Sequence, residues 1–161
     1  TMTLVLGDSL CAAIQYKKKF SKEIFKRYHK GGSLGKNLLL VKDIMTSGKK
    51  IPTIDKNKTI GDAAKVISAK KLGLVLVMKK NKLISIATDG DCRRGLAKFS
   101  KNDKIEKIAT RNPFKIDENT TAYKALSVMN QKKITSLIVS SSSGKIKGIC
   151  HIHHLLTHGI K

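Results

Sequence analysis

The sequence contains no tryptophan, only three cysteines and no long apolar run. Cys11, Cys92 and Cys150 lie far apart and form no Cys-x-x-Cys pair, which argues against a disulfide framework or a structural zinc site and for a reducing compartment. No apolar run approaches the ~20 residues of a membrane span. The N-terminus also lacks the basic-then-apolar order of a signal peptide, so we expect a cytoplasmic protein with no membrane partner.

Acidic residues are also scarce: 11 stand against 33 lysines and arginines, giving a net charge of +22. Such an excess suits contacts with nucleic-acid phosphates. The basic residues are dispersed, however, in doublets such as Lys49-Lys50 and Lys132-Lys133, and aromatic side chains that would stack on bases do not lie between them. We interpret the charge as a solvated surface and keep nucleic-acid binding as the less favoured alternative.

An internal repeat organises most of the chain. Ile54-Asp55-Lys56-Asn57 recurs 62 residues later as Ile116-Asp117-Glu118-Asn119. Each copy has the pattern of a short helix, an extended segment, an amphipathic helix, a strand, a turn, a second strand and a last helix. Two copies fill the chain from about Val41 to its end, and the alternation of helices and strands predicts an α/β (α+β) fold.

Local signals place the main elements of each copy. Thr59, with Asp62 three residues on, predicts a capped helix start in the first copy, followed by strands over Leu72–Met78 and up to Thr88. In the second copy, a helix starts near Thr121. The strands predicted after it are Ser136–Ser140 and Ile146–Cys150.

The first 40 residues differ from the repeats. Helical spacing predicts helices over Leu4–Lys17 and Ser21–Tyr28, which are too short to enclose a core of their own. We therefore expect this segment to be the tail of a larger domain. His29 begins the glycine-rich turn that follows, and it suits either a helix C-terminus or proton transfer.

The stretch from Leu83 to Leu96 carries the chemistry that points to a ligand. A strand ends at Thr88, and Asp89-Gly90-Asp91 leads into a helix, whose free N–H groups suit phosphate. Thr88, Asp89 and Asp91 are therefore candidate nucleotide-binding residues, although Thr88 or Asp89 could simply cap the helix.

In the second copy His151 and His154 occupy the positions of Thr88 and Asp91, and by that correspondence they are candidate nucleotide-binding residues as well. His154 and His158 are four residues apart, as helical zinc ligands can be, but no third ligand lies at a suitable spacing. We expect a helix cap with solvated histidines and no metal site.

The tandem repeat with Thr88-x-x-Asp91 resembles a pair of cystathionine-β-synthase (CBS) domains, two βαββα-type repeats related by pseudo-two-fold symmetry. The resemblance implies nucleotide binding, with Thr88 on phosphate and Asp91 on ribose. Because an imidazole cannot accept from two ribose hydroxyls, His151 and His154 make a second nucleotide site doubtful. The resemblance also implies a homodimer.

A more specific resemblance rests on several motifs. They are Leu6-Gly7-Asp8-Ser9-Leu10, His29-x-Gly31-Gly32-Ser33-Leu34-Gly35, Asp43-Ile44-Met45, Thr88-Asp89-Gly90-Asp91-x-Arg93-Arg94 and Ile134-Thr135-Ser136. In this order they resemble the second half of bacterial arabinose-5-phosphate isomerases, which join a sugar isomerase (SIS) domain to a CBS pair.

Membership of that family would divide the chain into a SIS remnant (1–40) and two CBS domains (41–100 and 101–161). His29 would be an active-site residue for interconversion of ribulose 5-phosphate and arabinose 5-phosphate, which feeds Kdo and lipopolysaccharide synthesis. Most of the catalytic domain would be absent, so we expect a regulatory portion that is inactive alone. It would require no cofactor and would sense a nucleotide such as CMP-Kdo, AMP or ATP. The alternative is a structural or dimerising CBS pair of another sugar-phosphate or nucleotide enzyme.

Overall fold

The computed structural model describes residues 1–21, 24 and 38–161, which divide into the units Thr1–Leu38 and Leu39–Lys161. In the first unit, α1 (Met2–Lys17) is a helix whose residues are all exposed, including Leu6 and Leu10. The helix predicted over Leu4–Lys17 is thus present and two residues longer. Of the segment predicted as a second helix, Ser21–Tyr28, only Ser21 and Ile24 are described, and His29 lies outside the described residues.

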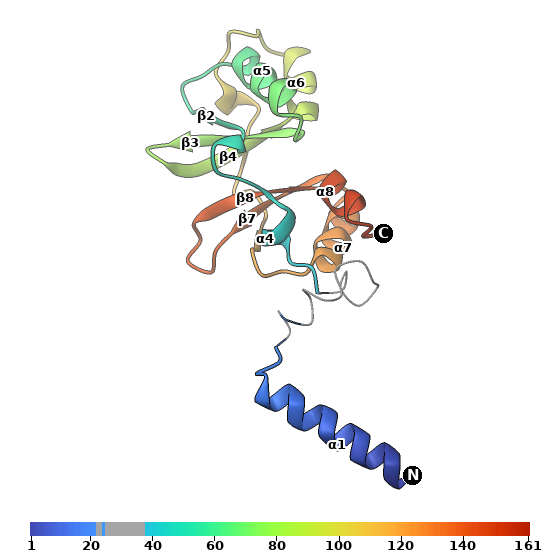
Figure 1. Cartoon of the computed structure of the whole chain (residues 1–161). Helices are drawn as coiled ribbons and strands as arrows, with labels where there is room; N and C mark the ends of the chain where they lie inside the picture. The colour runs from blue at the N-terminus through green and yellow to red at the C-terminus, as the bar shows by residue number, and fades with distance from the viewer. Residues whose placement is uncertain (22–23, 25–37) are drawn as a thin grey trace. The chain divides into compact units, whose positions relative to one another are not determined.

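The second unit contains the two repeats, and each has the predicted order of elements (Figure 1). The first repeat comprises α4 (Val41–Ile44), β1 (Thr46–Ser47), a 3₁₀ turn (Gly48–Lys50), β2 (Thr53–Asp55), α5 (Ile60–Lys70), β3 (Leu74–Lys79), β4 (Lys82–Thr88) and α6 (Asp89–Leu96). The second comprises a 3₁₀ turn (Ile105–Lys107), β5 (Thr110–Arg111), β6 (Lys115–Asp117), α7 (Ala122–Lys132), β7 (Ser136–Ser140), β8 (Ile146–His151) and α8 (Ile152–Thr157).

The two repeats exchange their first strands. One sheet has the order β2-β3-β4-β5 and the other β1-β8-β7-β6, so that β5 completes the sheet of the first repeat and β1 that of the second. Thr46 pairs with Ile149, and Thr110 pairs with Ile86 in the matching register. The two sheets have the same topology, as expected for pseudo-two-fold symmetry.

Helix boundaries follow from side-chain caps and from lysines in an unusual conformation. Thr59 Oγ1 accepts from the Asp62 N–H, and an Asp62 carboxylate oxygen accepts from the Thr59 N–H, which confirms the predicted capping box of α5. Thr121 caps α7 through its side chain. Both helices end at a lysine with φ of 54°, Lys71 and Lys133, in the left-handed region that terminates helices.

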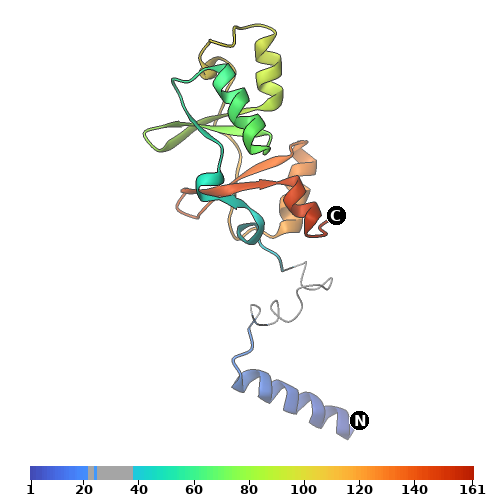
Figure 2. The same cartoon turned by 45° about the horizontal axis from the view of Figure 1, so that its top comes forward.

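Side chains along the central strands point alternately to the two faces of each sheet, and this alternation separates three apolar clusters. On β3, Val75 and Val77 pack beneath α5, whereas Leu74 and Leu76 face the other sheet together with Ile138. The helices therefore lie on the outer faces and the sheets pack on each other between them, as Figures 1 and 2 show. Burial on both faces explains why β3 is continuously apolar.

The strand predicted over Leu72–Met78 begins two residues later, at Leu74. Lys71 and Gly73 both have positive φ and turn the chain from α5 into the strand, although Leu72 between them is buried. The turn predicted at Lys80-Asn81 is present, with both residues at positive φ, as two-residue hairpins require.

Candidate functional site

A cleft of about 1040 Å³ opens between the two repeats beside the start of α6. The first repeat contributes the beginning of β3, the end of β4 and the first turns of α6. The second contributes the segment after β5 and the segment between α7 and β7. The lining residues are Gly73, Leu74, Ile86, Thr88, Asp89, Gly90, Arg93, Arg94, Thr110, Asn112, Pro113, Phe114, Lys132, Lys133, Ile134, Thr135, Ser136 and Ile138.

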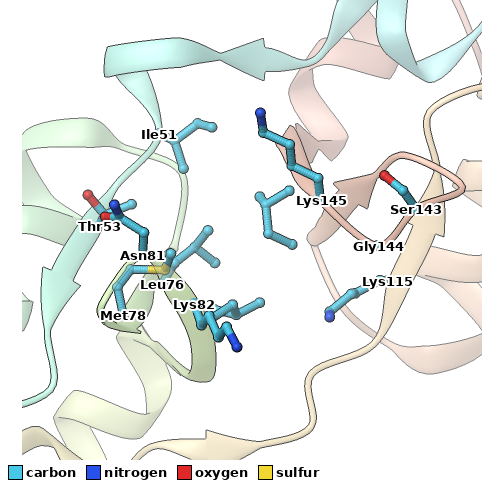
Figure 3. Close-up of a pocket in the computed structure, with 12 residues that line it drawn as sticks. Ile51, Thr53, Leu76, Met78, Asn81, Lys82, Lys115, Ser143, Gly144 and Lys145 are labelled. Atoms are coloured by element: carbon cyan, nitrogen blue, oxygen red, sulfur yellow. The ribbon is translucent and has the colours of Figure 1, made fainter.

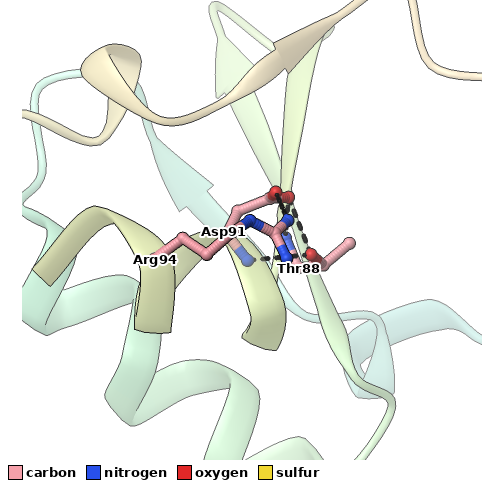
Figure 4. A network of polar contacts seen from close by, with 3 residues as sticks. All are labelled: Thr88, Asp91 and Arg94. Carbon is pink, nitrogen blue, oxygen red and sulfur yellow. Dashed lines mark hydrogen bonds and ion pairs between the residues drawn. The ribbon is translucent and has the colours of Figure 1, made fainter. Parts of the chain in front are cut away.

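A polar network joins Thr88, Asp91 and Arg94 at the start of α6 (Figure 4). Asp91 Oδ2 accepts from the Thr88 backbone N–H at 2.9 Å and from the Thr88 hydroxyl at 2.7 Å. Thr88 Oγ1 in turn accepts from the Asp91 N–H at 3.1 Å, and Arg94 donates to Asp91 Oδ1 at 2.7 Å. This is a capping box with an added hydroxyl and an added guanidinium contact.

The structure brings two of the three predicted residues of the first repeat to the cleft. Thr88 and Asp89 line the cleft, whereas Asp91 lines a smaller hollow on the other side of Arg94. The Asp91 carboxylate binds both Thr88 and Arg94. The roles of these residues toward a nucleotide stay predictions.

Cationic side chains from both repeats line the cleft. Arg93 and Arg94 project from α6, and Lys132 and Lys133 come from the end of α7. Lys132 Nζ lies 4.5 Å from the centre of the Phe114 ring, whose residue is 47% exposed. Cations suit phosphate or carboxylate groups, and an exposed aromatic face suits a flat base.

The contributions of Phe114, Lys132 and Lys133 were missed by the sequence reasoning. These residues are distant in sequence from the Thr88 motif, and the local pattern around them is that of a loop and a helix end. The motif Ile134-Thr135-Ser136, which adjoins Lys133 and whose residues line the cleft, is the sequence signal that could have drawn attention to this segment.

His151 and His154 form the corresponding cap at α8 and do not line this cleft. His154 Nδ1 accepts from the His151 N–H at 3.1 Å, and His151 Nδ1 accepts from the His153 N–H at 3.2 Å. Burial, and then the neighbouring His153 and His154, lower the pKa of His151 below its usual value of 6.5. Burial, followed by His158 and His153, does the same to the pKa of His154.

A second cavity of about 510 Å³ lies between the β3–β4 and β7–β8 turns (Figure 3). Its apolar wall includes Leu76 and Met78, and Lys82, Lys115 and Lys145 reach it from both repeats. With lysines so frequent across the whole chain, three among the lining residues do not single this cavity out.

Across residues 1–21, 24 and 38–161, no three histidine, cysteine or acidic side chains gather as metal ligands would. Within the same part of the chain, no helix is both long and apolar enough to cross a membrane.

Comparison with known proteins gives one family match and several similar sequences. The family model of the CBS domain matches residues 41–98 and 105–161. The chain is 40% identical to arabinose 5-phosphate isomerase KdsD of Francisella tularensis over 159 residues, which cover 97% of this chain and 49% of that protein. It is 37% identical to arabinose 5-phosphate isomerase KdsD of Yersinia pestis over 164 residues, 99% of this chain and 50% of that protein. The chain thus spans about half the length of these curated relatives.

Among solved structures, the CBS domain pair of protein MJ0100 is similar, with a TM-score of 0.66 and 26% identity over 77% of this chain and 99% of that one. That structure is a complex with 5′-methylthioadenosine and S-adenosyl-L-methionine.

Proposed function

Since the chain belongs to the CBS domain family, we propose that its two repeats are the nucleotide-sensing, regulatory part of an arabinose 5-phosphate isomerase. We divide the chain into a remnant of the sugar isomerase domain (1–40), a first CBS domain (41–100) and a second (101–161). The relatives that are named for this activity are about twice as long, which supports a regulatory portion joined to a catalytic body.

The observation that carries the proposal is the cleft beside α6. The N-terminus of α6, which Thr88 caps, offers backbone N–H groups to an anion, and Arg93 and Lys132 add positive charge. The apolar floor and the exposed Phe114 ring offer a surface for a base. Phosphate-binding and base-binding chemistry therefore meet in one cavity large enough for a nucleotide.

The ligand that we propose is a nucleotide or nucleotide sugar: CMP-Kdo as a downstream product of the pathway, or AMP or ATP. The adenosine-containing ligands of the MJ0100 pair support this class of molecule. His151 and His154 lack the carboxylate of Asp91, so we assign the nucleotide to the Thr88 cleft. In the full enzyme this signal would regulate conversion of ribulose 5-phosphate to arabinose 5-phosphate in the cytoplasm, for Kdo and lipopolysaccharide synthesis.

We expect the 161-residue chain to have no isomerase activity alone. His29 is the residue that we assign to the active site, and aldose–ketose isomerisation needs further groups that position the substrate and move protons. Adding a separately produced SIS domain and measuring ribulose 5-phosphate turnover tests this assignment. Turnover by the chain without such a domain would contradict it.

Thermal unfolding with CMP-Kdo, CMP, AMP and ATP tests the sensing role. A ligand at ~100 times its dissociation constant stabilises the fold by about 2.7 kcal/mol. We expect Arg93→Gln to weaken the shift, because Arg93 lines the cleft and its replacement leaves the α6 capping box in place. Lys65→Gln, which removes the same charge from the exposed side of α5, is the matched control and should keep the shift.

Two results would favour the alternatives. If no nucleotide shifts the unfolding temperature and light scattering shows a stable dimer, the repeats are a dimerising or structural module. If duplex or single-stranded DNA binds with a steep salt dependence, the net charge of +22 serves nucleic-acid binding instead.

A further inference from the structure

Four of the five histidines of the chain lie between positions 151 and 158, from the residue before α8 to the residue after it. Two of them, His151 and His154, make the hydrogen bonds that cap this helix. The equivalent cap of the first repeat uses the Thr88 hydroxyl and the Asp91 carboxylate. The two repeats thus cap equivalent helices with side chains of different acid–base chemistry.

The hydrogen bonds determine the protonation state of both rings. The His151 and His153 backbone N–H groups can only donate, so the Nδ1 atoms that accept from them carry no proton. Each ring is therefore neutral with its proton on Nε2. This tautomer also lets His154 Nε2 donate to Thr46 Oγ1, which lies 3.4 Å away on β1.

We propose that this histidine cap is a proton sensor, which opens the start of α8 on mild acidification while the carboxylate cap of α6 stays closed. A proton on Nδ1 would face a backbone N–H, so each capping bond is lost when its ring is protonated. The cap of α6 accepts through a carboxylate instead, a class of group that is ordinarily a much stronger acid than an imidazolium. Acidification from about pH 7 to about pH 5 therefore acts on one repeat and spares the other.

The surroundings of the cap offer an imidazolium no compensation. Of the elements with most contacts to α8, α7 carries Lys124 and Lys132 and β8 carries Lys147, and neither contains an acidic residue. The short helix α4 shares the apolar cluster of Leu155 and carries Lys42 and Asp43, whose carboxylate accepts from the Leu40 N–H. On β1 the facing group is the neutral hydroxyl of Thr46. Within the described residues, no carboxylate forms an ion pair with either capping ring, so protonation adds a cation to a cationic region.

The direction of the pH effect follows from this geometry. A ring that is held neutral in the folded chain takes up its proton more readily after unfolding, where its pKa returns to about 6.5. The contribution of the cap to stability is thus complete above about pH 6.5 and is lost as the pH falls below it.

The test uses the full 161-residue chain and the proton itself as the probe. Long-range ¹H–¹⁵N NMR of the histidine rings at about pH 7.5 should show the Nε2–H tautomer for His151 and His154. Hydrogen exchange of the His151 and His153 amides, with each rate divided by its intrinsic rate, should become faster as the pH falls below the transition. The expected increase is about tenfold per pH unit for each proton that the cap takes up. The amides of Thr88 and Asp91 should keep their protection over the same range.

Two variants separate the cap from a general effect of acid. His154→Asp supplies the acceptor used by the first repeat and should reduce the pH dependence at the His151 amide. His153→Gln removes an exposed ring that accepts no capping bond, and it should leave the pH dependence in place. If His154→Asp fails to fold, His151→Thr is the second variant, which should remove the pH dependence at the His153 amide.

Three outcomes would overturn the proposal. The first is an Nδ1–H tautomer in either capping ring. The second is protection of the His151 and His153 amides that does not change between about pH 7 and about pH 5. The third is an equal acid response in the wild type and in a folded His154→Asp variant.

Discussion

Asp91 and Asp62 complete capping boxes of the same design, but Asp91 also binds Arg94. Both carboxylates accept from the backbone N–H of the threonine that caps their helix and interact with the hydroxyl of that threonine. Asp91 accepts from Arg94 as well, whereas Asp62 has no ion-pair partner among the described residues. Replacing each aspartate with alanine therefore removes the contacts with the threonine and, for Asp91, the ion pair too.

The expected loss for Asp91→Ala can be worked contact by contact. The shared capping bond contributes about 1 kcal/mol. The Thr88 hydroxyl bond to a half-buried carboxylate adds about 1 kcal/mol, and the ion pair adds at most about 0.5 kcal/mol because the Arg94 side chain is 70% exposed. The sum of about 2.5 kcal/mol corresponds to a fall of roughly 8–10 °C in the unfolding temperature for a domain of this size.

Thermal unfolding followed by circular dichroism measures both variants under the same conditions. We expect Asp91→Ala to unfold at a lower temperature than Asp62→Ala, and only Asp91→Ala to lose affinity for the nucleotide found with the wild type. Isothermal titration well below both transitions keeps affinity apart from stability. Equal unfolding temperatures would refute the contribution of the Arg94 contact, and full affinity in Asp91→Ala would refute the proposed role of Asp91 in binding ribose.

Three further predictions test the core, the strand pairing and the thiols. Met129→Ala empties a site that is 1% exposed and should cost about 2–5 kcal/mol in urea unfolding; a loss below about 1 kcal/mol would show that the core closes over the cavity. Gly148→Ala places a Cβ 2.5 Å from the Thr46 carbonyl oxygen and should lower stability by about 1–3 kcal/mol, whereas an unchanged unfolding temperature would contradict the β1–β8 contact. At pH 8 a thiol reagent should modify the exposed Cys11 at once and Cys150 only after unfolding, because burial raises the pKa of Cys150 to about 12; rapid reaction of Cys150 in the folded chain would contradict this.

The sequence predicted those parts of the fold that local chemistry determines. Thr59 and Asp62 define a helix start within four residues, and the predicted strand Ser136–Ser140 matches the structure in both bounds. The internal repeat predicted the remaining elements. A sequence pattern that occurs twice identifies a structural unit even where the pattern in each copy is weak. The repeat and the Thr88-x-x-Asp91 motif together predict a CBS pair, which the match of the CBS family model to residues 41–98 and 105–161 confirms.

The sequence could not predict what depends on contacts between the repeats. The strands Thr46–Ser47 and Thr110–Arg111 have two residues each, too few for a period, and they exist because the opposite repeat offers a free sheet edge. Phe114 and Lys132 reach the cleft for the same reason, since folding places them beside Thr88. The orientation of Asp91 toward Arg94 is likewise a three-dimensional property that spacing alone leaves open.

The exchange of β1 and β5 means that neither repeat is complete by itself. A single repeat produced alone would present an unpaired strand edge and an uncovered apolar sheet face, because Leu74 and Leu76 are buried by the other repeat. A second copy of the same repeat could satisfy both, since the two sheets share one topology. The Leu39–Lys161 unit thus has the architecture of a symmetric dimer fused into one polypeptide, which explains how its halves could diverge to a carboxylate in one cap and a histidine in the other.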